Sequence, residues 1–289
     1  MLGILLIDKP QGLTSHDVVN RVRRRLGTKR VGHAGTLDPL ATGLLVVAVG
    51  PATRFLQYLP LEPKVYEARI TFGQASSTYD AEGDLTAFSS PPALKEALEE
   101  HLPKFLGLIS QMPPMFSAIK VQGQPLYKYA RLGKEIEREP RTVHIGAFDI
   151  LSVEDHFIEA RIECSGGTYI RSLAHDLGEA MGCGAYLSGL KRTHVGRFAL
   201  DQAQPLDAID PVKMIPLKDA LPPMPLLEID EQHTQHIREG RPIGMAEPPE
   251  SPLIALIEPR GHVFSVARIH GNVLQPECVI PAEVFDGNL

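Results

Sequence analysis

The sequence predicts an α+β fold that ends in a small β-rich module. Segments of alternating hydrophobicity, which are typical of half-buried antiparallel strands, are interspersed with segments of helical periodicity. Hydrophobic residues make up 43% of the 289 residues and charged residues 22%, so the chain can bury a large core. A proline-rich stretch over residues 217–225 predicts a linker before the C-terminal module.

The N-terminal part begins with a short apolar run, Ile4–Ile7, which predicts a buried first strand and not a signal peptide. Ser15 is the predicted N-cap of a helix, with Asp17 in its first turn and Gly27 at its end. The apolar positions of that helix recur at helical spacing and are Val19, Val22 and Leu26. A strand over residues 44–49 and a short helix over residues 51–58 complete this part.

The middle of the chain alternates strands and helices. In Lys64–Phe72 the side chains of alternate residues point to one face, which predicts a half-buried strand. A helix over residues 93–106 is expected to be interrupted near Pro103. The other predicted elements are paired strands over residues 143–152 and 157–164, a helix over 168–181 capped by Thr168, and a strand over 184–195.

Two segments differ from this alternation. Residues 113–141 look like an insertion, with a hairpin turn at Gln122-Gly123 and a short basic helix over residues 126–132. Its aromatic residues are interleaved with lysines and arginines. The tail is expected to contain a helix over residues 234–239 and strands over 253–257 and 262–269.

Composition narrows the possible function classes. The three cysteines are isolated and include no CxxC pair, which favours a reducing, cytoplasmic location and argues against a metal site. The eleven histidines show no HExxH spacing, and no apolar run is long enough to span a membrane. We therefore expect a cytoplasmic protein that needs no metal and no organic cofactor and has no membrane partner.

Net charge and charge distribution point in different directions. The formal net charge of −6 argues against nucleic acid as a partner, but the basic residues are clustered. Three groups stand out, namely Arg21, Arg23, Arg24, Arg25, Lys29 and Arg30; Lys120, Lys128, Arg131, Lys134, Arg138 and Arg141; and Lys191, Arg192 and Arg197. The first group directly precedes the most informative loop of the chain. A solvated helix face is the alternative explanation for that group.

That loop is GHAGTLDPLATG, residues 32–43, in which His33 and Asp38 are the ionisable residues. Its glycines permit close backbone approach, and Pro39 favours an extended conformation at Asp38. A single carboxylate on a stiff loop is how a fold presents a nucleophile or a base. An ordinary Asp-Pro turn is the competing interpretation.

The loop strongly resembles the catalytic loop of the TruB family of pseudouridine synthases. Four more segments resemble that family in the same order, DKPQGLTS at 8–15, KVYEA at 64–68, GTYIRSLA at 167–174 and LKRT at 190–193. The resemblance is clear over residues 1–200 and weaker beyond. It implies an isomerase that converts uridine 55 in the T-loop of transfer RNA (tRNA) to pseudouridine.

The resemblance also implies an architecture. Residues 1–222 would be the pseudouridine synthase domain, with a central mixed, mainly antiparallel sheet flanked by helices. Residues 113–142 would be a thumb that folds over bound RNA, and residues 223–289 a PUA-like RNA-binding domain. The expected partner is the T-arm stem-loop of tRNA, which a monomer would bind.

The resemblance assigns roles to individual residues. Asp38 would act covalently, Arg171 would pair with it, and Tyr66 would stack on the uracil and move a proton. His33 would fill the gap left by the flipped base. The remaining expected substrate- and RNA-binding residues are Gly32, Thr36, Leu37, Lys9, Lys64, Tyr169, Ile170, Leu190 and Lys191. Of these, Ile170 and Leu190 would line the uracil pocket, and the three lysines would contact phosphates.

Other functions remain open at this stage. A non-catalytic RNA-binding protein or tRNA-folding chaperone would need the basic surface, but would not need Asp38, Tyr66 and Arg171 together in one pocket. A metal-dependent hydrolase using His33 and Asp38 would need further clustered ligands. Without the family resemblance, Tyr66 would be assigned to the core, and Arg171 could pair at the surface with Asp176.

Overall fold

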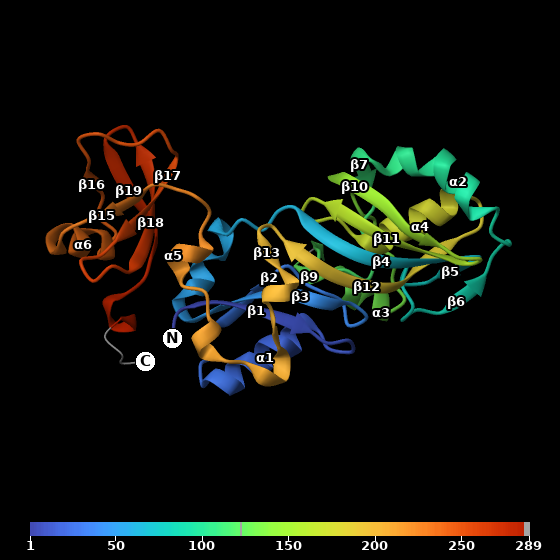
Figure 1. Ribbon diagram of the computed structural model, residues 1–289, viewed down its shortest axis with the longest axis horizontal. Coiled ribbons are helices and arrows are strands. Elements are labelled where there is room, and N and C mark those ends of the chain that lie inside the picture. Colours follow the sequence, from blue (N-terminus) through green and yellow to red (C-terminus); the bar gives the residue numbers. More distant parts are fainter. Residues whose placement is uncertain (122, 286–289) are drawn as a thin grey trace.

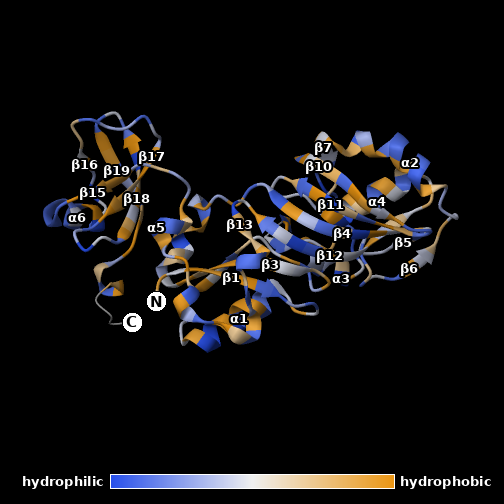
Figure 2. Cartoon of the chain, in the orientation of Figure 1, coloured by the Kyte–Doolittle hydropathy of each residue, from blue (hydrophilic) through white to orange (hydrophobic). Residues whose placement is uncertain are grey.

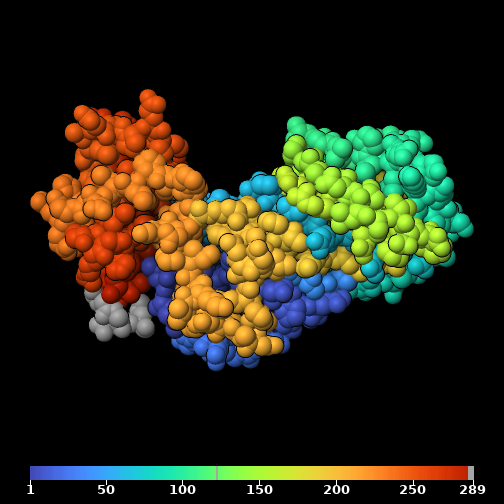
Figure 3. Space-filling view, viewed as in Figure 1, coloured from blue at the N-terminus to red at the C-terminus, as the bar shows by residue number. Residues whose placement is uncertain are grey.

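The computed structural model describes residues 1–121 and 123–285, which form a ten-stranded sheet, a five-stranded sheet and two small hairpins. The five-stranded sheet lies at one end of the molecule, and the part that carries β5 (Gln74–Ser76), β6 (Leu85–Ala87) and α2 (Leu94–His101) lies at the other (Figure 1). The space-filling view shows a concave upper edge between the C-terminal module and the part that carries β7 and α2 (Figure 3). The predicted α+β class is confirmed.

The ten-stranded sheet is mixed and mainly antiparallel, as expected. Its order is β14-β1-β3-β12-β4-β11-β10-β7, with β2 on β3 and β13 on β12, and the pairs β1–β14 and β3–β12 are parallel. Its strands are β1 (Gly3–Lys9), β2 (Val31–Ala34), β3 (Thr42–Val49), β4 (Lys64–Phe72), β7 (Gly107–Gln111), β10 (Arg141–Val153), β11 (Phe157–Cys164), β12 (Ala185–Val195), β13 (Phe198–Ala199) and β14 (Gln204–Pro205). Hydrophobic and hydrophilic residues alternate along β11 (Figure 2).

Helices cover both faces of this sheet. The α-helices are α1 (Ser15–Leu26), α2 (Leu94–His101), α3 (Leu126–Arg131), α4 (Ile170–Ala180), α5 (Leu217–Ala220) and α6 (Glu231–Arg238). The 3₁₀ helices are η1 (Gly50–Tyr58), η2 (Leu102–Phe105), η3 (Leu200–Gln202), η4 (Leu206–Ala208), η5 (Pro211–Lys213) and η6 (Ala282–Val284). Helix α1 packs on β1 and β3, whereas α2 and α4 pack on β4, β10, β11 and β12.

Two predicted helix caps are wrong. The N-cap of α1 is Thr14, because its hydroxyl accepts from the Asp17 backbone N–H (3.1 Å) and the Asp17 carboxylate accepts from the Thr14 N–H (2.9 Å). Ser15 is instead buried. Helix α4 begins after Tyr169 without a side-chain cap, so Thr168 does not have the predicted role. Gly27 ends α1 in the left-handed conformation (φ 65°), as predicted.

The predicted insertion contains a two-stranded hairpin, β8 (Lys120–Val121) and β9 (Gln124–Pro125), followed by the basic helix α3. Gln122, half of the predicted turn, lies outside the described residues. A second hairpin, β5 (Gln74–Ser76) and β6 (Leu85–Ala87), lies at the end of the molecule opposite the five-stranded sheet (Figure 1).

The tail is β-rich, as predicted. Its sheet has the order β15-β17-β18-β19-β16, with β15 (Leu226–Glu228), β16 (Ile243–Gly244), β17 (Leu253–Ile257), β18 (Val263–His270) and β19 (Val273–Val279). The predicted linker is wrong in part, because residues 217–220 form α5, in which Leu217 and Ala220 are buried. Helix α6 also starts earlier than expected, after the N-cap Asp230. In the described part of the chain, no helix is long and apolar enough to cross a membrane.

Candidate active site

The predicted loop over residues 32–43 spans the end of β2, the connection between the strands and the start of β3, and the connection is anchored by α1. Ser15, at the start of α1, accepts from the backbone N–H of Leu37 (2.8 Å) and donates to the Leu37 carbonyl (3.1 Å). The Gly12 N–H donates to the Pro39 carbonyl (2.8 Å). The residue after Leu37 is Asp38, so these bonds hold the backbone on both sides of the carboxylate.

Arg192 anchors the two ends of the loop. It lies on β12, is 1% exposed, and donates from Nε to the Leu44 carbonyl (2.8 Å) and from Nη2 to the Gly35 carbonyl (3.1 Å). At Gly43 a Cβ atom would lie 2.4 Å from the Arg192 carbonyl oxygen, so only glycine fits there. The prediction that Arg192 contributes to a basic surface is therefore wrong.

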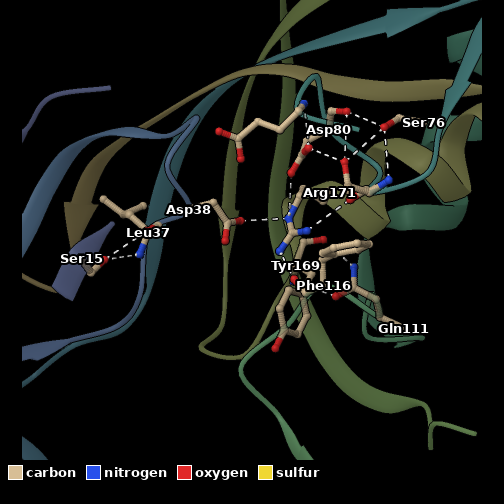
Figure 4. A network of polar contacts seen from close by, with 11 residues as sticks. Ser15, Leu37, Asp38, Ser76, Asp80, Gln111, Phe116, Tyr169 and Arg171 are labelled. Carbon is tan, nitrogen blue, oxygen red and sulfur yellow. Dashed lines mark hydrogen bonds and ion pairs between the residues drawn. The ribbon is translucent and has the colours of Figure 1, made fainter. Parts of the chain in front are cut away.

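Asp38 and Arg171 form an ion pair, with 2.9 Å between Oδ2 of Asp38 and Nε of Arg171 (Figure 4). The side chain of Asp38 is 36% exposed, whereas that of Arg171 is 5% exposed. Arg171 also donates from Nη1 to the Thr78 carbonyl (3.2 Å) and from Nη2 to the Phe116 carbonyl (2.7 Å). The buried guanidinium is thus held on three sides and directs one edge at the accessible carboxylate.

Asp80 is a second carboxylate beside Arg171, which the sequence analysis did not single out. Its Oδ2 lies 3.6 Å from Nε of Arg171, and its side chain is 4% exposed. Its Oδ1 accepts from the Thr78 hydroxyl (2.5 Å) and from the Glu82 backbone N–H (3.0 Å). The signal in the sequence was the hydroxyl-rich run before Asp80, because a buried carboxylate needs such donors.

The electrostatics of the pair leave Asp38 poorly stabilised as an anion. Burial raises the pKa of Asp38 above its ordinary value, and the nearby Asp80 adds to the shift, whereas Arg171 opposes it. Arg171 shares its positive charge between two carboxylates. A partly exposed carboxylate in such surroundings is suited to react, because its charge is not fully neutralised.

Tyr66 lies on β4 in the apolar cluster that also contains Leu37 and Ile170. It is 7% exposed, and burial raises the pKa of its hydroxyl. Arg192 opposes that shift, whereas the charge of Asp38 adds to it. The structure therefore brings Tyr66, Asp38 and Arg192 into one electrostatic neighbourhood, in which Tyr66 stays protonated near neutral pH.

The other predicted pocket residues lie around the start of α4 and on β12. Tyr169 is held by Gln111, which accepts from its backbone N–H (2.8 Å) and donates to its carbonyl (3.0 Å). Ile170 is buried, and Leu190 is half-buried at the edge of the same cluster. Leu37, predicted to bind RNA, is 3% exposed and packs into the core, whereas Thr36 is exposed.

The three lysines predicted to contact phosphates differ in exposure. Lys9 has no exposed surface, and its Nζ donates to the carbonyls of Leu13 (2.6 Å) and Pro10 (3.0 Å). Burial lowers the pKa of Lys9 to about 8. Lys64 is half-buried, with its pKa also lowered by burial. Lys191 is exposed, with Nζ 3.8 Å from Oε2 of Glu67. A phosphate can therefore reach Lys64 and Lys191 but not Lys9 in this conformation.

His33 and Gly32 lie on β2, at the start of the segment over residues 32–43. The Nδ1 atom of His33 is buried and has no hydrogen-bond partner within the described residues. Burial and the charge of Arg192 lower the pKa of His33, so the ring is neutral at pH 7. No group of three or more potential metal ligands occurs within residues 1–121 and 123–285.

Comparison with known proteins identifies close relatives. A family model described as TruB family pseudouridylate synthase (N-terminal domain) matches residues 23–170, and one described as tRNA pseudouridylate synthase B C-terminal domain matches residues 171–221. Both matched regions contribute strands to the same ten-stranded sheet. The chain is 40% identical to "tRNA pseudouridine synthase B" of Solibacter usitatus over an alignment of 297 positions, which covers 99% of this chain and 100% of that protein.

A further relative and two solved structures are also similar to this chain. The protein of the same name from Syntrophotalea carbinolica is 44% identical over 250 residues, which cover 84% of this chain and 82% of that protein. Among solved structures, a chain of a Cbf5-Nop10-Gar1 complex is 25% identical, with a TM-score of 0.65 and coverage of 96% of this chain and 84% of that chain. A chain of an H/ACA RNP bound to a substrate RNA is 23% identical (TM-score 0.64; 96% and 85% coverage) and shares the fold.

Proposed function

The chain belongs to the TruB family of pseudouridylate synthases, and we propose that it converts uridine 55 in the T-loop of tRNA to pseudouridine. The observation that carries the proposal is the ion pair between Arg171 and Asp38, which lies on the loop that resembles the catalytic loop of the family. The name and full-length coverage of the relative from Solibacter usitatus support tRNA as the substrate class.

The reaction breaks the N1–C1′ bond, turns the uracil and forms a C5–C1′ bond. C5 loses its proton and N1 gains one, so no redox step or external atom is needed. Asp38 acts as a nucleophile that divides this rearrangement into two steps, by attack on either the ribose C1′ or the uracil ring. Its partial exposure leaves the carboxylate open to substrate, and the anchored backbone keeps it in one orientation.

Arg171 keeps Asp38 ionised and directed, since burial alone would favour the neutral acid. Tyr66 stacks on the uracil, and its protonated hydroxyl can transfer a proton during isomerisation. Ile170 and Leu190 form the apolar walls, with Tyr169 beside them. A target base inside a folded T-loop must be flipped out to reach this site.

RNA binding involves surfaces around the site. His33 fills the stack after base flipping, which suits its neutral ring and unpaired Nδ1. Gly32 and Thr36 flank it, and Lys64 and Lys191 bind phosphates. The thumb (residues 113–142) closes over the T-arm, and we place the boundary between the catalytic and PUA-like domains at 222/223. The protein acts as a monomer without metal or organic cofactor.

The test is incubation with an unmodified tRNA transcript and chemical mapping of pseudouridine. Conversion at position 55, and none in a transcript with cytidine there, is the expected result, and EDTA should not change the rate on prefolded tRNA. Tight binding of the transcript without any conversion would instead favour the non-catalytic RNA-binding or chaperone function.

A further inference from the structure

The turn formed by residues 78–80, which contacts Arg171, has a strained backbone. Tyr79 has a φ of 66°, and it is the single non-glycine residue of the described chain with positive φ. This backbone conformation is uncommon for a residue with a bulky side chain and tends to occur at functional sites. The turn belongs to the loop between β5 and β6, and its neighbours Thr78 and Asp80 both contact Arg171.

The ring of Tyr79 is stacked on the imidazole of His175, with 3.9 Å between centroids and 8° between planes. His175 lies on α4, four residues after Arg171, so both side chains leave the same face of the helix. The turn is therefore joined to α4 twice, through the stacked rings and through the hydrogen bond from Arg171 to the Thr78 carbonyl.

The turn is also joined to β12. The Leu187 N–H donates to the Tyr79 carbonyl (3.0 Å), and the Ala81 N–H donates to the Leu187 carbonyl (3.1 Å). These bonds join the turn to β12 and not to α4. The contact between the rings is what presses the turn toward α4, where the Thr78 carbonyl and the Asp80 carboxylate meet the guanidinium of Arg171.

We propose that Tyr79 and His175 are positioning residues, whose stacked rings hold the Thr78–Asp80 turn against α4 and thereby keep Arg171 directed at Asp38. In this proposal the rings act through Arg171 and not on the substrate itself. The catalytic consequence rests on the proposed function, since it needs Asp38 to be the reacting carboxylate.

The contact depends on ring shape more than on polar atoms. Burial lowers the pKa of His175, so its ring is neutral, and its Nδ1 has no hydrogen-bond partner within the described residues. An apolar aromatic ring should therefore replace it. We expect Tyr79→Phe and His175→Phe to behave like the parent, whereas Tyr79→Ala and His175→Ala lose the contact.

The first measurement is the single-turnover rate at saturating enzyme on an unmodified tRNA transcript. Each alanine variant should lose about tenfold or more in rate, with tRNA affinity within about twofold of the parent, because a small displacement of a catalytic group is costly. The double alanine variant should be no slower than the slower single variant, since both remove one contact. The matched control is Phe157→Ala, which removes a remote ring that stacks under Arg69.

The second measurement does not depend on activity. In protein labelled with ¹⁵N at arginine Nε, the NMR signal of Arg171 can be assigned with the variant Arg171→Lys. The proton on Nε of Arg171 should exchange slowly with solvent in the parent, because Nε is buried. Exchange should be at least about fivefold faster in the alanine variants and unchanged in the phenylalanine variants.

The two measurements separate the claims. An inactive parent would contradict the proposed function, while the exchange data would still test whether the stacked rings hold the Thr78–Asp80 turn against α4. Folded alanine variants with parental exchange and parental rate would overturn the inference, as would equal losses in the phenylalanine and alanine variants. If Tyr79→Ala does not fold, the comparison of His175→Phe with His175→Ala decides the question.

Discussion

The Asp38 loop and the thumb are both expected to contact the substrate, but they are built in opposite ways. The loop is fixed by buried side chains, since Ser15 holds its middle and Arg192 holds both ends. In the thumb, residues 131–135 are all exposed, and its helix α3 has six residues with Leu126 as its buried anchor. The part proposed to perform chemistry is preorganised, whereas the part proposed to grip RNA is held by fewer buried side chains.

The two regions meet at Arg171. Its Nε pairs with Asp38 in the loop, and its Nη2 donates to the Phe116 carbonyl at the base of the thumb. The neighbouring Ser172 hydroxyl donates to the Met112 carbonyl (2.9 Å). Movement of the base of the thumb would therefore displace the guanidinium of Arg171, which pairs with the proposed catalytic carboxylate of Asp38.

The largest effect on the loop is expected from Arg192→Met. The change leaves the carbonyls of Gly35 and Leu44 without their buried donor, so the free energy of unfolding should fall by about 3 kcal/mol. The single-turnover rate should fall about 100-fold, because the ends of the loop are released. Denaturant titration and rapid-quench assays measure the two effects.

The control is Arg25→Met, which removes an exposed arginine from α1 and should change the free energy of unfolding by less than about 0.5 kcal/mol. Equal stability of Arg192→Met and the parent would show that the loop is not held from β12, and the contrast with the thumb would disappear.

Thumb substitutions should affect binding and not stability. Replacing the exposed Lys128 and Lys134 with alanine should weaken tRNA binding about tenfold at low salt and reduce the salt dependence by about two counterions. The free energy of unfolding should stay within about 0.5 kcal/mol of the parent. Fluorescence anisotropy over a salt series measures the affinity.

The matched pair for this test is Lys95 and Lys104, exposed lysines on α2 and η2. Their replacement should leave the salt dependence close to that of the parent. The same loss in both double variants would mean that the thumb binds RNA only through general charge.

The smallest expected effect is that of Asp38→Asn on the free energy of unfolding. Because burial raises the folded-state pKa of Asp38, ionisation of the carboxylate destabilises the folded protein as the pH rises above the ordinary pKa of an aspartate, and does so in full above the folded-state pKa. Asp38→Asn should therefore be at least as stable as the parent at pH 7. Its advantage should disappear as the pH falls toward the ordinary pKa of an aspartate, about 4. Thermal unfolding between pH 4 and pH 7 tests this, and a lower Tm of the variant at pH 7 would contradict it.

Local patterns predicted much of the fold. Alternation in Lys64–Phe72 predicted β4 and its buried face, and Gly27 marked the end of α1. The N-cap of α1 was misplaced by one residue, although Thr14 lies three residues before Asp17, which is the spacing of a capping box. The adjacent Ser15 instead makes tertiary hydrogen bonds with Leu37. Helix α5 was missed because prolines bracket a short segment whose burial depends on distant contacts.

The site was predicted less completely than the fold. The family resemblance assigned Asp38 and Arg171, and the structure brings them together. Asp80 was overlooked because it lies in an acidic stretch that looks like exposed surface, and its partner Arg171 is far along the chain. Arg192 was misjudged for the converse reason, since a basic residue between Lys191 and Thr193 gives no sign of burial.

The central claim is that Asp38 performs covalent chemistry on tRNA from a fixed position, and one comparison tests it most directly. Single-turnover conversion of an unmodified tRNA transcript should fall at least about 1,000-fold in both Asp38→Asn and Asp38→Glu, while transcript affinity stays within about threefold of the parent. The amide cannot act as a nucleophile, and the longer acid is misplaced on an anchored loop. Conversion by Asp38→Asn within about tenfold of the parent would contradict the account.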